Sequence, residues 1–323
     1  MTSTIGIIGC GLIGETHAEA LAELGNPATL YVDFNKSRAS ALAKKFGGRA
    51  VESPSEILHS DLIEAVYICT HHDSHASLAT QAAKHGKHIF IEKPLALTER
   101  EAFEVVVAVE HSSVICMSGF KLRFYPLVAE ASKLIPKPTV IVATILDRRW
   151  PDDSWANDPE IGGGNVLSQG CHGVDLVCEF ANAKPIRVIA EGGNEHHPGL
   201  RITDTLAMTL TFANGTIANL TIADAGESPV TGKFSFQLMD GERSLHLFDR
   251  LKELSFTDGT QTLQRKESEE VGFLEENRAF LTALQTRTRP KSDHFAGLRA
   301  TAILERAITS ARTHQPQSLE DLP

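Results

Sequence analysis

The chain has few cysteines and none of the cysteine patterns that mark a disulfide framework or a zinc site. No Cys-x-x-Cys pair occurs, and most of the cysteines stand among apolar residues, where a free thiol behaves as a small hydrophobic side chain. We therefore expect reduced, buried thiols and a cytoplasmic protein. The five cysteines in 323 residues are Cys10, Cys69, Cys116, Cys171 and Cys178.

The chain also lacks a long hydrophobic run and an excess of positive charge. A membrane-spanning helix needs about 20 consecutive apolar residues, and no segment approaches that length. The amino terminus shows no basic region followed by an apolar core, so we expect no secretory signal. The formal net charge of -10 argues against nucleic acid or an anionic membrane as the main partner. Without internal repeats or low-complexity stretches, a chain of this length is expected to form two domains.

In the first third, short apolar segments alternate with helical patterns. Gly47-Gly48 indicates the end of one helix, and Thr98 is a plausible cap at the start of another. Strands that alternate with helices of this length are typical of βαβ units around a parallel sheet. The predicted strands are residues 4–8, 29–33, 65–70, 88–93 and 113–118, and the predicted helices end near residues 24, 46, 85 and 111.

The first predicted strand runs directly into a glycine-rich turn. Gly9, Gly11 and Gly14 form the pattern G-x-G-x-x-G at the start of a helix, and Asp33 ends the next strand. In this context Gly9 would make the tight turn, Gly11 would admit a pyrophosphate and Gly14 would allow close packing of helix and strand. The helix amino terminus would present free N–H groups and a positive dipole end to the phosphates. The sequence therefore predicts a dinucleotide site.

Asp33 favours NAD over NADP, because a carboxylate accepts hydrogen bonds from both ribose hydroxyls and repels a 2′-phosphate. Lys36 and Arg38 lie close by in the sequence and keep NADP as the weaker alternative. The residues predicted to contact the cofactor are Gly9, Gly11, Leu12, Ile13, Gly14, Asp33, Phe34, Arg38, Thr70, His71 and His75.

Three histidines, His71, His72 and His75, follow the predicted strand 65–70. No cysteine or carboxylate cluster with ligand spacing accompanies them, so we expect no metal. Contact of His71 and His75 with the nicotinamide half of the cofactor is one interpretation. Satisfied polar groups at a helix start are the alternative, with Ser74 as the cap residue.

Lys93 ends an apolar strand, in the run His88-Ile89-Phe90-Ile91-Glu92-Lys93-Pro94. Strands buried in parallel sheets are hydrophobic, and their carboxyl ends open onto the ligand crevice. Lys93 is thus expected where a cofactor or substrate is met, on a backbone stiffened by Pro94. The alternative is a solvated lysine at a strand-to-loop junction.

After about Gly119 the pattern changes to longer strands and fewer helices. Asn214-Gly215 is a hairpin turn signal between two alternating segments. We expect a dinucleotide-binding α/β domain over residues 1–120, followed by an α+β domain over residues 121–323 with a large, mostly antiparallel open sheet. The predicted strands are 140–146, 202–212, 216–222, 233–239, 244–248 and 254–257, and the terminal helices are 271–285 and 294–313.

The chemical side chains of this second part are concentrated after the glycine run Gly162–Gly164. Ser168, His172 and Asp175 fall at i, i+4 and i+7 of a helical pattern and would share one helix face. Asp175 could fix the tautomer of His172, as orienting carboxylates commonly do. A histidine that simply belongs to a helix core is the alternative.

Taken together, these motifs resemble the Gfo/Idh/MocA oxidoreductases, which include inositol and glucose-fructose dehydrogenases. The similarity comprises the glycine pattern with Asp33, the run Glu92-Lys93-Pro94-Leu95-Ala96 and the glycine loop before Gly-His172-x-x-Asp175-Leu, and it covers nearly the whole chain. The resemblance implies a Rossmann domain and an α/β domain whose open sheet mediates homodimers or homotetramers, with the last helix packing back on the Rossmann domain. It also implies hydride transfer between NAD(P) and a carbinol carbon of a sugar, polyol or related compound.

The resemblance further implies roles for individual residues. Lys93 would lie beside the reacting C–O bond, His172 would be the general acid/base, and Glu92 and Lys93 would border the nicotinamide ribose. The Lys93–Pro94 bond is cis in many members. Ser168 stands where many polyol dehydrogenases of the family carry Asp, so His172 would have a less basic imidazole or would rely on Asp175 or on a substrate group. The residues expected to bind substrate are Lys93, Arg123, Trp155, Ser168, His172 and Asp175.

Two other interpretations use the same residues. One is a redox-assisted lyase or glycosidase that recycles NAD within each turnover, and the other is a non-catalytic nucleotide-sensing regulator. The presence of both Lys93 and His172 argues against the regulator. The sequence does not distinguish a cyclitol from an aldose, a ketose, an anhydrosugar or a sugar acid.

Overall fold

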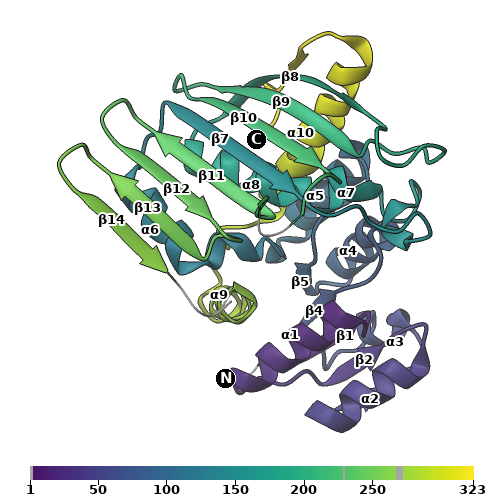
Figure 1. The fold of residues 1–323 in the computed structure, drawn as a ribbon. Coiled ribbons are helices and arrows are strands. Elements are labelled where there is room, and N and C mark those ends of the chain that lie inside the picture. The colour runs from purple at the N-terminus through teal and green to yellow at the C-terminus, as the bar shows by residue number, and fades with distance from the viewer. Residues whose placement is uncertain (1–2, 228–229, 267–271) are drawn as a thin grey trace. The chain divides into compact units, whose positions relative to one another are not determined.

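A computed structural model describes residues 3–227, 230–266 and 272–323 (Figure 1). Within these ranges the chain divides into two compact units. Unit 1 consists of residues 3–121 and 272–298, and unit 2 consists of the described residues between 122 and 266 together with 299–323. Val271, where the sequence predicts the start of a helix, lies outside the described residues.

Unit 1 is built on a parallel sheet, as the sequence predicts. Its described strands pair in the order β3-β2-β1-β4-β5-β6, and all of these pairs are parallel. β1 and β4 are fully buried, which explains their continuous apolar sequence. Because β1 pairs with both β2 and β4, the carboxyl ends of β1 and β4 form the switch point at which open α/β sheets bind ligands. The strands are β1 (Ile5–Ile8), β2 (Leu30–Val32), β3 (Arg49–Ala50), β4 (Ala65–Ile68), β5 (His88–Ile91) and β6 (Cys116–Ser118).

The helices of unit 1 begin and end with local signals that the sequence carries. Thr98 and Glu101 form a capping box at the start of one helix, and Gly47 ends another with a φ of 86°. The sequence analysis missed β3 and α3, because two and five residues are too few to show a period. The elements are α1 (Leu12–Glu23), α2 (Lys36–Phe46), α3 (Pro54–Leu58), η1 (His72–Ser74), α4 (His75–Lys84), α5 (Glu99–Ser112) and α9 (Gly272–Thr286).

Unit 2 contains a large open sheet (Figure 1). Its described strands pair in the order β14-β13-β12-β11-β7-β10-β9-β8-β15, and every pair except β7–β10 is antiparallel. The predicted Asn214-Gly215 turn connects β9 to β10. The strands are β7 (Val140–Leu146), β8 (Pro185–Gly193), β9 (Thr205–Phe212), β10 (Ile217–Ala223), β11 (Phe234–Met239), β12 (Ser244–Phe248), β13 (Glu253–Thr257), β14 (Thr262–Lys266) and β15 (Gln317–Ser318).

Helices pack against one face of this sheet. Figure 1 shows α8 behind β7 and β10, and a side chain at Gly170 of α8 would meet Ile222 of β10. On the strands, buried and more exposed residues alternate, so the other face carries its own apolar residues, including Val140, Val142 and Ile217. The helices are η2 (Lys121–Phe124), α6 (Pro126–Leu134), η3 (Trp155–Asn157), α7 (Gly164–Ser168), α8 (Gly170–Ala181) and α10 (His294–Thr313), of which η2 and α10 begin in residues of unit 1.

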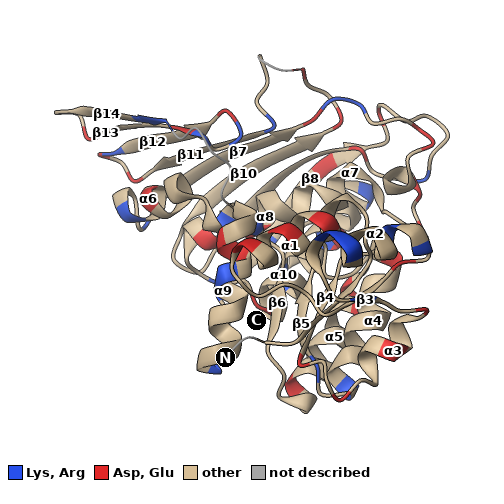
Figure 2. Ribbon diagram, turned by 90° about the horizontal axis from the view of Figure 1, so that it is seen from below, with Lys and Arg blue, Asp and Glu red and all other residues tan. Residues whose placement is uncertain are grey.

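Charge is distributed over both units. Figure 2 shows basic and acidic residues on helices and loops of each unit, in keeping with the mixed composition of the sequence. In the part of the chain that the structure describes, no helix combines the length and the apolar character needed to cross a bilayer.

Candidate active site

The glycine turn after β1 has the geometry that a dinucleotide requires. Gly9 has a φ of 94°, and a Cβ there would lie 2.5 Å from the carbonyl oxygen of Cys69. A Cβ on Gly14 would lie 2.0 Å from the carbonyl oxygen of Gly9, so only glycine lets α1 begin this close to the turn. A Cβ on Gly11 would point into open space, at the place where a pyrophosphate would approach the start of α1. The residues present therefore fit a dinucleotide.

A cavity of about 460 Å³ lies at this turn in unit 1. It brings together residues from the carboxyl ends of β1, β2 and β4, which is the switch point of the sheet. Of the residues predicted to contact the cofactor, those that line it are Gly9, Gly11, Asp33, Phe34, Arg38, Thr70 and His71. The sequence analysis missed other lining residues, among them Glu52, Cys69, Asp73, Ser74 and Ser77.

Asp33 is held in place by backbone donors. Its Oδ2 accepts the N–H of Cys10 and its Oδ1 accepts the N–H of Asn35, each at 2.7 Å. Lys36, which kept NADP open as an alternative, forms an ion pair with Glu52. The carboxylate of Asp33 thus stands at the pocket with its orientation fixed, which favours two ribose hydroxyls over a 2′-phosphate.

The lining of the pocket also includes an aromatic and a basic side chain. The Phe34 side chain is 85% exposed, and the Arg38 guanidinium lies 6.0 Å from its ring centroid. The His71 ring lies 6.4 Å from the same centroid. Such an exposed aromatic side chain offers a flat apolar surface to a base.

His75 occupies a different place from the one expected of a cofactor ligand. It is fully buried, with Nδ1 2.7 Å from the carbonyl oxygen of Pro94 and Nε2 3.1 Å from that of Thr70. Burial lowers its pKa, so the neutral ring donates to one carbonyl at a time. His75 therefore anchors the segment that carries Lys93, which corresponds to the structural alternative. Ser74 stands at the N-cap position of α4, but its hydroxyl donates to Thr70 and His71 instead.

Lys93 follows β5, next to the switch point. It is half-buried, and the Lys93–Pro94 peptide bond is cis. Its backbone N–H donates to Glu92 Oε2 at 3.1 Å. Glu92 itself is buried and also accepts a hydrogen bond from His17 at 2.9 Å, so its carboxylate is engaged within unit 1.

In unit 2, His172 lies on α8 and is 3% exposed. The helix that the sequence predicts is broken at Gln169, because α7 ends at Ser168 and α8 begins at Gly170. The backbone N–H of His172 donates to the carbonyl of Gln169 at 3.1 Å. Its ring packs edge-on against Phe234 of β11, with centroids 6.0 Å apart. Ser168 is also buried, whereas Trp155 is 41% exposed.

Arg123 and Asp175, both expected to bind substrate, are paired with each other. Arg123 donates from Nε and Nη2 to the two oxygens of Asp175 at 2.7 and 2.6 Å, and from Nη1 to Glu179 at 2.6 Å. The Arg123 and Asp175 side chains are 6% and 2% exposed. Burial lowers the pKa of Arg123, but the two carboxylates together raise it above its ordinary value. The bidentate pair favours a structural role over contact with substrate, and it occupies the carboxylate that was expected to orient His172.

We expect Arg123→Met to lower the free energy of unfolding by about 3–5 kcal/mol, because it leaves the Asp175 carboxylate buried without its partner. The double variant Arg123→Met/Asp175→Leu should regain much of that loss, since it removes both charges. Urea unfolding followed by circular dichroism measures both effects. Arg100→Met is the matched control: its pair with Glu104 is exposed, so it should cost less than about 1 kcal/mol. If Arg123→Met is as stable as Arg100→Met, the structural role of the Arg123–Asp175 pair is contradicted.

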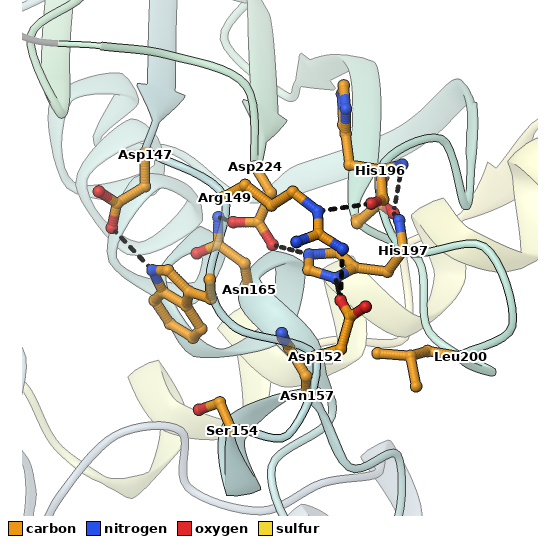
Figure 3. Close-up of polar contacts among 12 residues, drawn as sticks. Asp147, Arg149, Asp152, Ser154, Asn157, Asn165, His196, His197, Leu200 and Asp224 are labelled. Carbon is orange, nitrogen blue, oxygen red and sulfur yellow. Dashed lines mark hydrogen bonds and ion pairs between the residues drawn. The ribbon is translucent and has the colours of Figure 1, made fainter.

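Unit 2 also holds a polar network that no sequence pattern indicated (Figure 3). His197 is fully buried, with Nδ1 2.7 Å from Asp152 and Nε2 2.9 Å from Asp224. Asp224 also accepts a hydrogen bond from Asn165 of α7. Figure 3 shows how these contacts connect the loop after β7 and the loop after β8 to α7. The network thus fixes the helix that leads to His172.

A second carboxylate holds the His197 loop. Asp204 accepts the backbone N–H groups of Glu195, His196 and His197 at 2.9–3.0 Å. These hydrogen bonds lower the pKa of Asp204 although burial acts in the opposite direction. Asp152 and Asp224, by contrast, lie 45 and 27 positions from His197, which is why no local pattern could reveal that part of the network.

Comparisons with known proteins agree with this geometry. Residues 3–120 match the family model described as oxidoreductase family, NAD-binding Rossmann fold, and residues 131–235 match that of the GFO/IDH/MocA C-terminal domain. The chain is 27% identical to D-xylose 1-dehydrogenase (NADP(+)) 2 of Haloferax volcanii, over 95% of this chain and 97% of the relative. It is 29% identical to myo-inositol 2-dehydrogenase of Thermotoga maritima, over 66% of each chain, which is just under two thirds.

The fold is also that of a solved structure, levoglucosan dehydrogenase in complex with NADH and levoglucosan. The TM-score is 0.91, with 99% of this chain and all of that chain covered, at 20% sequence identity. At this identity the likeness concerns the fold.

Proposed function

The chain belongs to the Gfo/Idh/MocA family of NAD(P)-dependent oxidoreductases, and from this premise we propose that it oxidises a carbinol carbon of a sugar, polyol or sugar derivative, or reduces the corresponding carbonyl. The observation that carries the proposal is in unit 1: the cavity at Gly9, Gly11 and Asp33 lies at the switch point, and Lys93 follows the strand next to it. We assign cofactor binding to residues 1–120 and substrate binding to residues 121–323.

The cofactor would be held by the glycine turn and Asp33. The start of α1 would receive the pyrophosphate, Asp33 the adenosine ribose and Phe34 with Arg38 the base. When bound, NAD(P)⁺ supplies the hydride acceptor. The fixed Asp33 carboxylate and the Lys36–Glu52 pair support NAD as the preferred form.

The chain's own contribution to the chemistry is the movement of one proton. In oxidation, His172 accepts the proton of the substrate hydroxyl, and the Lys93 ammonium stabilises the negative charge that develops on the oxygen. In reduction the same two groups act in reverse. Ser168 stands in place of the usual carboxylate, and Asp175 is paired with Arg123. The stabilisation of the substrate oxygen by Lys93 therefore contributes more to the reaction here than in relatives with an Asp–His pair.

The test is a screen of NAD⁺ and NADP⁺ reduction over cyclitols, aldoses, ketoses, anhydrosugars and sugar acids. We expect one substrate class to give reduced cofactor in a 1:1 ratio to product, followed by the absorbance of the reduced nicotinamide, with a higher kcat/KM for NAD⁺. Product without net reduced cofactor would instead indicate a redox-recycling lyase or glycosidase. Tight cofactor binding with no turnover of any class would favour a regulator.

The open sheet of unit 2 also supports an assembly. Its strands expose the apolar side chains of Val140, Val142, Ile189 and Ile217, and exposed apolar residues on a sheet are commonly covered by a second subunit. We propose a homodimer or homotetramer formed through this sheet, which the mass of the protein in solution would establish. The five free cysteines support a reducing, cytoplasmic location.

A further inference from the structure

A buried acid cluster lies beside Lys93 in unit 1 and is not used by the mechanism above. His17 of α1, Glu92 and Glu276 of α9 each place one nitrogen or oxygen atom within 4.8 Å of the others. His17 and Glu276 are fully buried, and Glu92 is 7% exposed. Among the described residues, neither carboxylate oxygen of Glu276 has a hydrogen-bond partner. Two buried carboxylates this close are costly to ionise together.

Asn277 fixes the tautomer of His17. Its Nδ2 donates one hydrogen to the carbonyl oxygen of Phe273 at 2.7 Å and the other to Nδ1 of His17 at 2.8 Å. Because a carbonyl oxygen can only accept, the amide nitrogen must face Phe273 and the amide orientation is set. Nδ1 of His17 therefore accepts, and Nε2 carries the hydrogen that it donates to Glu92 at 2.9 Å.

The tautomer of His17 indicates whether the cluster binds a metal ion or a proton. A metal would need the lone pair of Nε2 on His17. That nitrogen carries a hydrogen, so His17 is not available as a ligand, and two carboxylates alone make a poor site next to the ammonium group of Lys93. The cluster therefore favours a proton.

The two carboxylates are not equivalent. Burial acts to raise the pKa of Glu92, but Glu92 accepts hydrogen bonds from His17 and from the backbone N–H of Lys93, which favour its ionised form, and its pKa lies below its ordinary value. Burial raises the pKa of Glu276 well above its ordinary value, and the charge of Glu92 adds to the effect. The proton therefore belongs on Glu276.

The other titratable groups around the pair add no negative charge. Lys121 and Lys93 favour the ionised form of Glu276 but do not outweigh its burial. Burial raises the pKa values of Tyr67 on β4 and of Cys69 just after it, so both stay neutral. With Glu92 ionised, the total charge of Glu92 and Glu276 therefore depends only on whether Glu276 is protonated.

We propose that Glu276 is a positioning residue for Lys93: held as the neutral acid beside ionised Glu92, it leaves one negative charge next to Lys93 instead of two. The inference rests on the role given to Lys93 in the proposed function. A second buried negative charge would offset the positive charge with which the Lys93 ammonium stabilises the substrate oxygen.

Two isosteric variants separate the carboxylates, because Glu276→Gln replaces a neutral group and Glu92→Gln removes a charge. The readout is the pH at which the Lys93 amine becomes reactive, measured by competitive acylation and mass spectrometry. We expect Glu276→Gln to leave this midpoint at its wild-type position and Glu92→Gln to lower it, because only the second variant removes a negative charge. Glu275→Gln is the matched control, since Glu275 is the preceding residue of α9 and pairs with Arg278 at the surface.

Infrared spectroscopy reports the proton directly. At neutral pH the wild type and Glu275→Gln should show the carbonyl stretch of a buried, protonated carboxylic acid, and Glu276→Gln should lack it. The proposal is overturned if this band persists in Glu276→Gln, or if Glu276→Gln moves the Lys93 midpoint as far as Glu92→Gln does. A rise in melting temperature with Zn²⁺ that Glu276→Gln abolishes would also overturn it.

The labelling and infrared measurements need neither substrate nor cofactor. They therefore test the role of Glu276 even if the substrate screen finds no activity. In an active enzyme, the alkaline limb of the kcat/KM profile should move with Glu92→Gln by the same amount as the labelling midpoint and stay in place with Glu276→Gln. A limb that does not follow the labelling midpoint would refute the positioning role while leaving the proposed function standing.

Discussion

Replacing Lys93 by alanine is expected to lower kcat by about 10³-fold while the affinity for the nicotinamide cofactor changes little. A positioned proton donor or charge-stabilising group contributes about 10²–10⁴-fold to the rate. Lys93 has the placement for this role, because it is half-buried after β5, next to the switch point where the cavity lies. The glycine turn and Asp33, which would hold the cofactor, are on other strands and remain intact.

The measurement is kcat for the substrate found in the screen, together with cofactor affinity from the fluorescence of the reduced nicotinamide. Lys93→Arg tests whether charge alone suffices, and it should recover only a small part of the activity because the guanidinium is planar and larger. Lys84→Ala, an exposed lysine of α4, is the control that should behave like the wild type. A Lys93→Ala enzyme within about tenfold of the wild type would rule out the charge-stabilising role.

The parallel sheet and the glycine turn of unit 1 could be predicted from the sequence because their signals are local. β1, β4 and β5 are buried on both faces and therefore appear as apolar runs. The turn needs glycine at Gly9 for its positive φ and at Gly14 for its close approach to the carbonyl oxygen of Gly9, and both reasons act over a few residues. The hairpin at Asn214-Gly215 is local in the same sense.

What the sequence could not indicate depends on contacts between distant segments. The pairing of Arg123 with Asp175 joins residues 52 positions apart, both of which the sequence predicts to bind substrate. His197 follows β8 and bonds Asp152, which follows β7, and Asp224, which follows β10. His17 and Asn277 are 260 residues apart. Periodicity reports which face of an element is buried, but it does not report which polar group on another element will meet it.

The helix around His172 illustrates an intermediate case. The i, i+4, i+7 spacing correctly indicated a helical segment, but the chain breaks at Gln169, so Ser168 ends one helix and His172 belongs to the first turn of the next. Whether Ser168 and His172 share one helix face depends on this break. The single glycine Gly170 does not indicate the break in the sequence.

His172→Ala is expected to lower kcat by about 10²–10⁴-fold, since it removes the group that accepts the hydroxyl proton. Cofactor affinity should again be unchanged, because the cavity of unit 1 contains no residue of α8. His246→Asn is the control: His246 is a partly buried histidine of β12 whose ring bonds Ser235, away from α8.

A loss of activity alone would not separate a proton acceptor from a packing residue, since the His172 ring also contacts Phe234. The substitution leaves a cavity of roughly the volume of the lost ring, and added imidazole can occupy it as a diffusible base. We expect imidazole to restore part of kcat in His172→Ala but to leave Lys93→Ala unchanged, because an imidazole base does not replace the ammonium charge. If imidazole restores neither variant, or if His172→Asn, which fills most of the space, recovers the activity, then His172 acts by packing and Lys93 alone carries the proton.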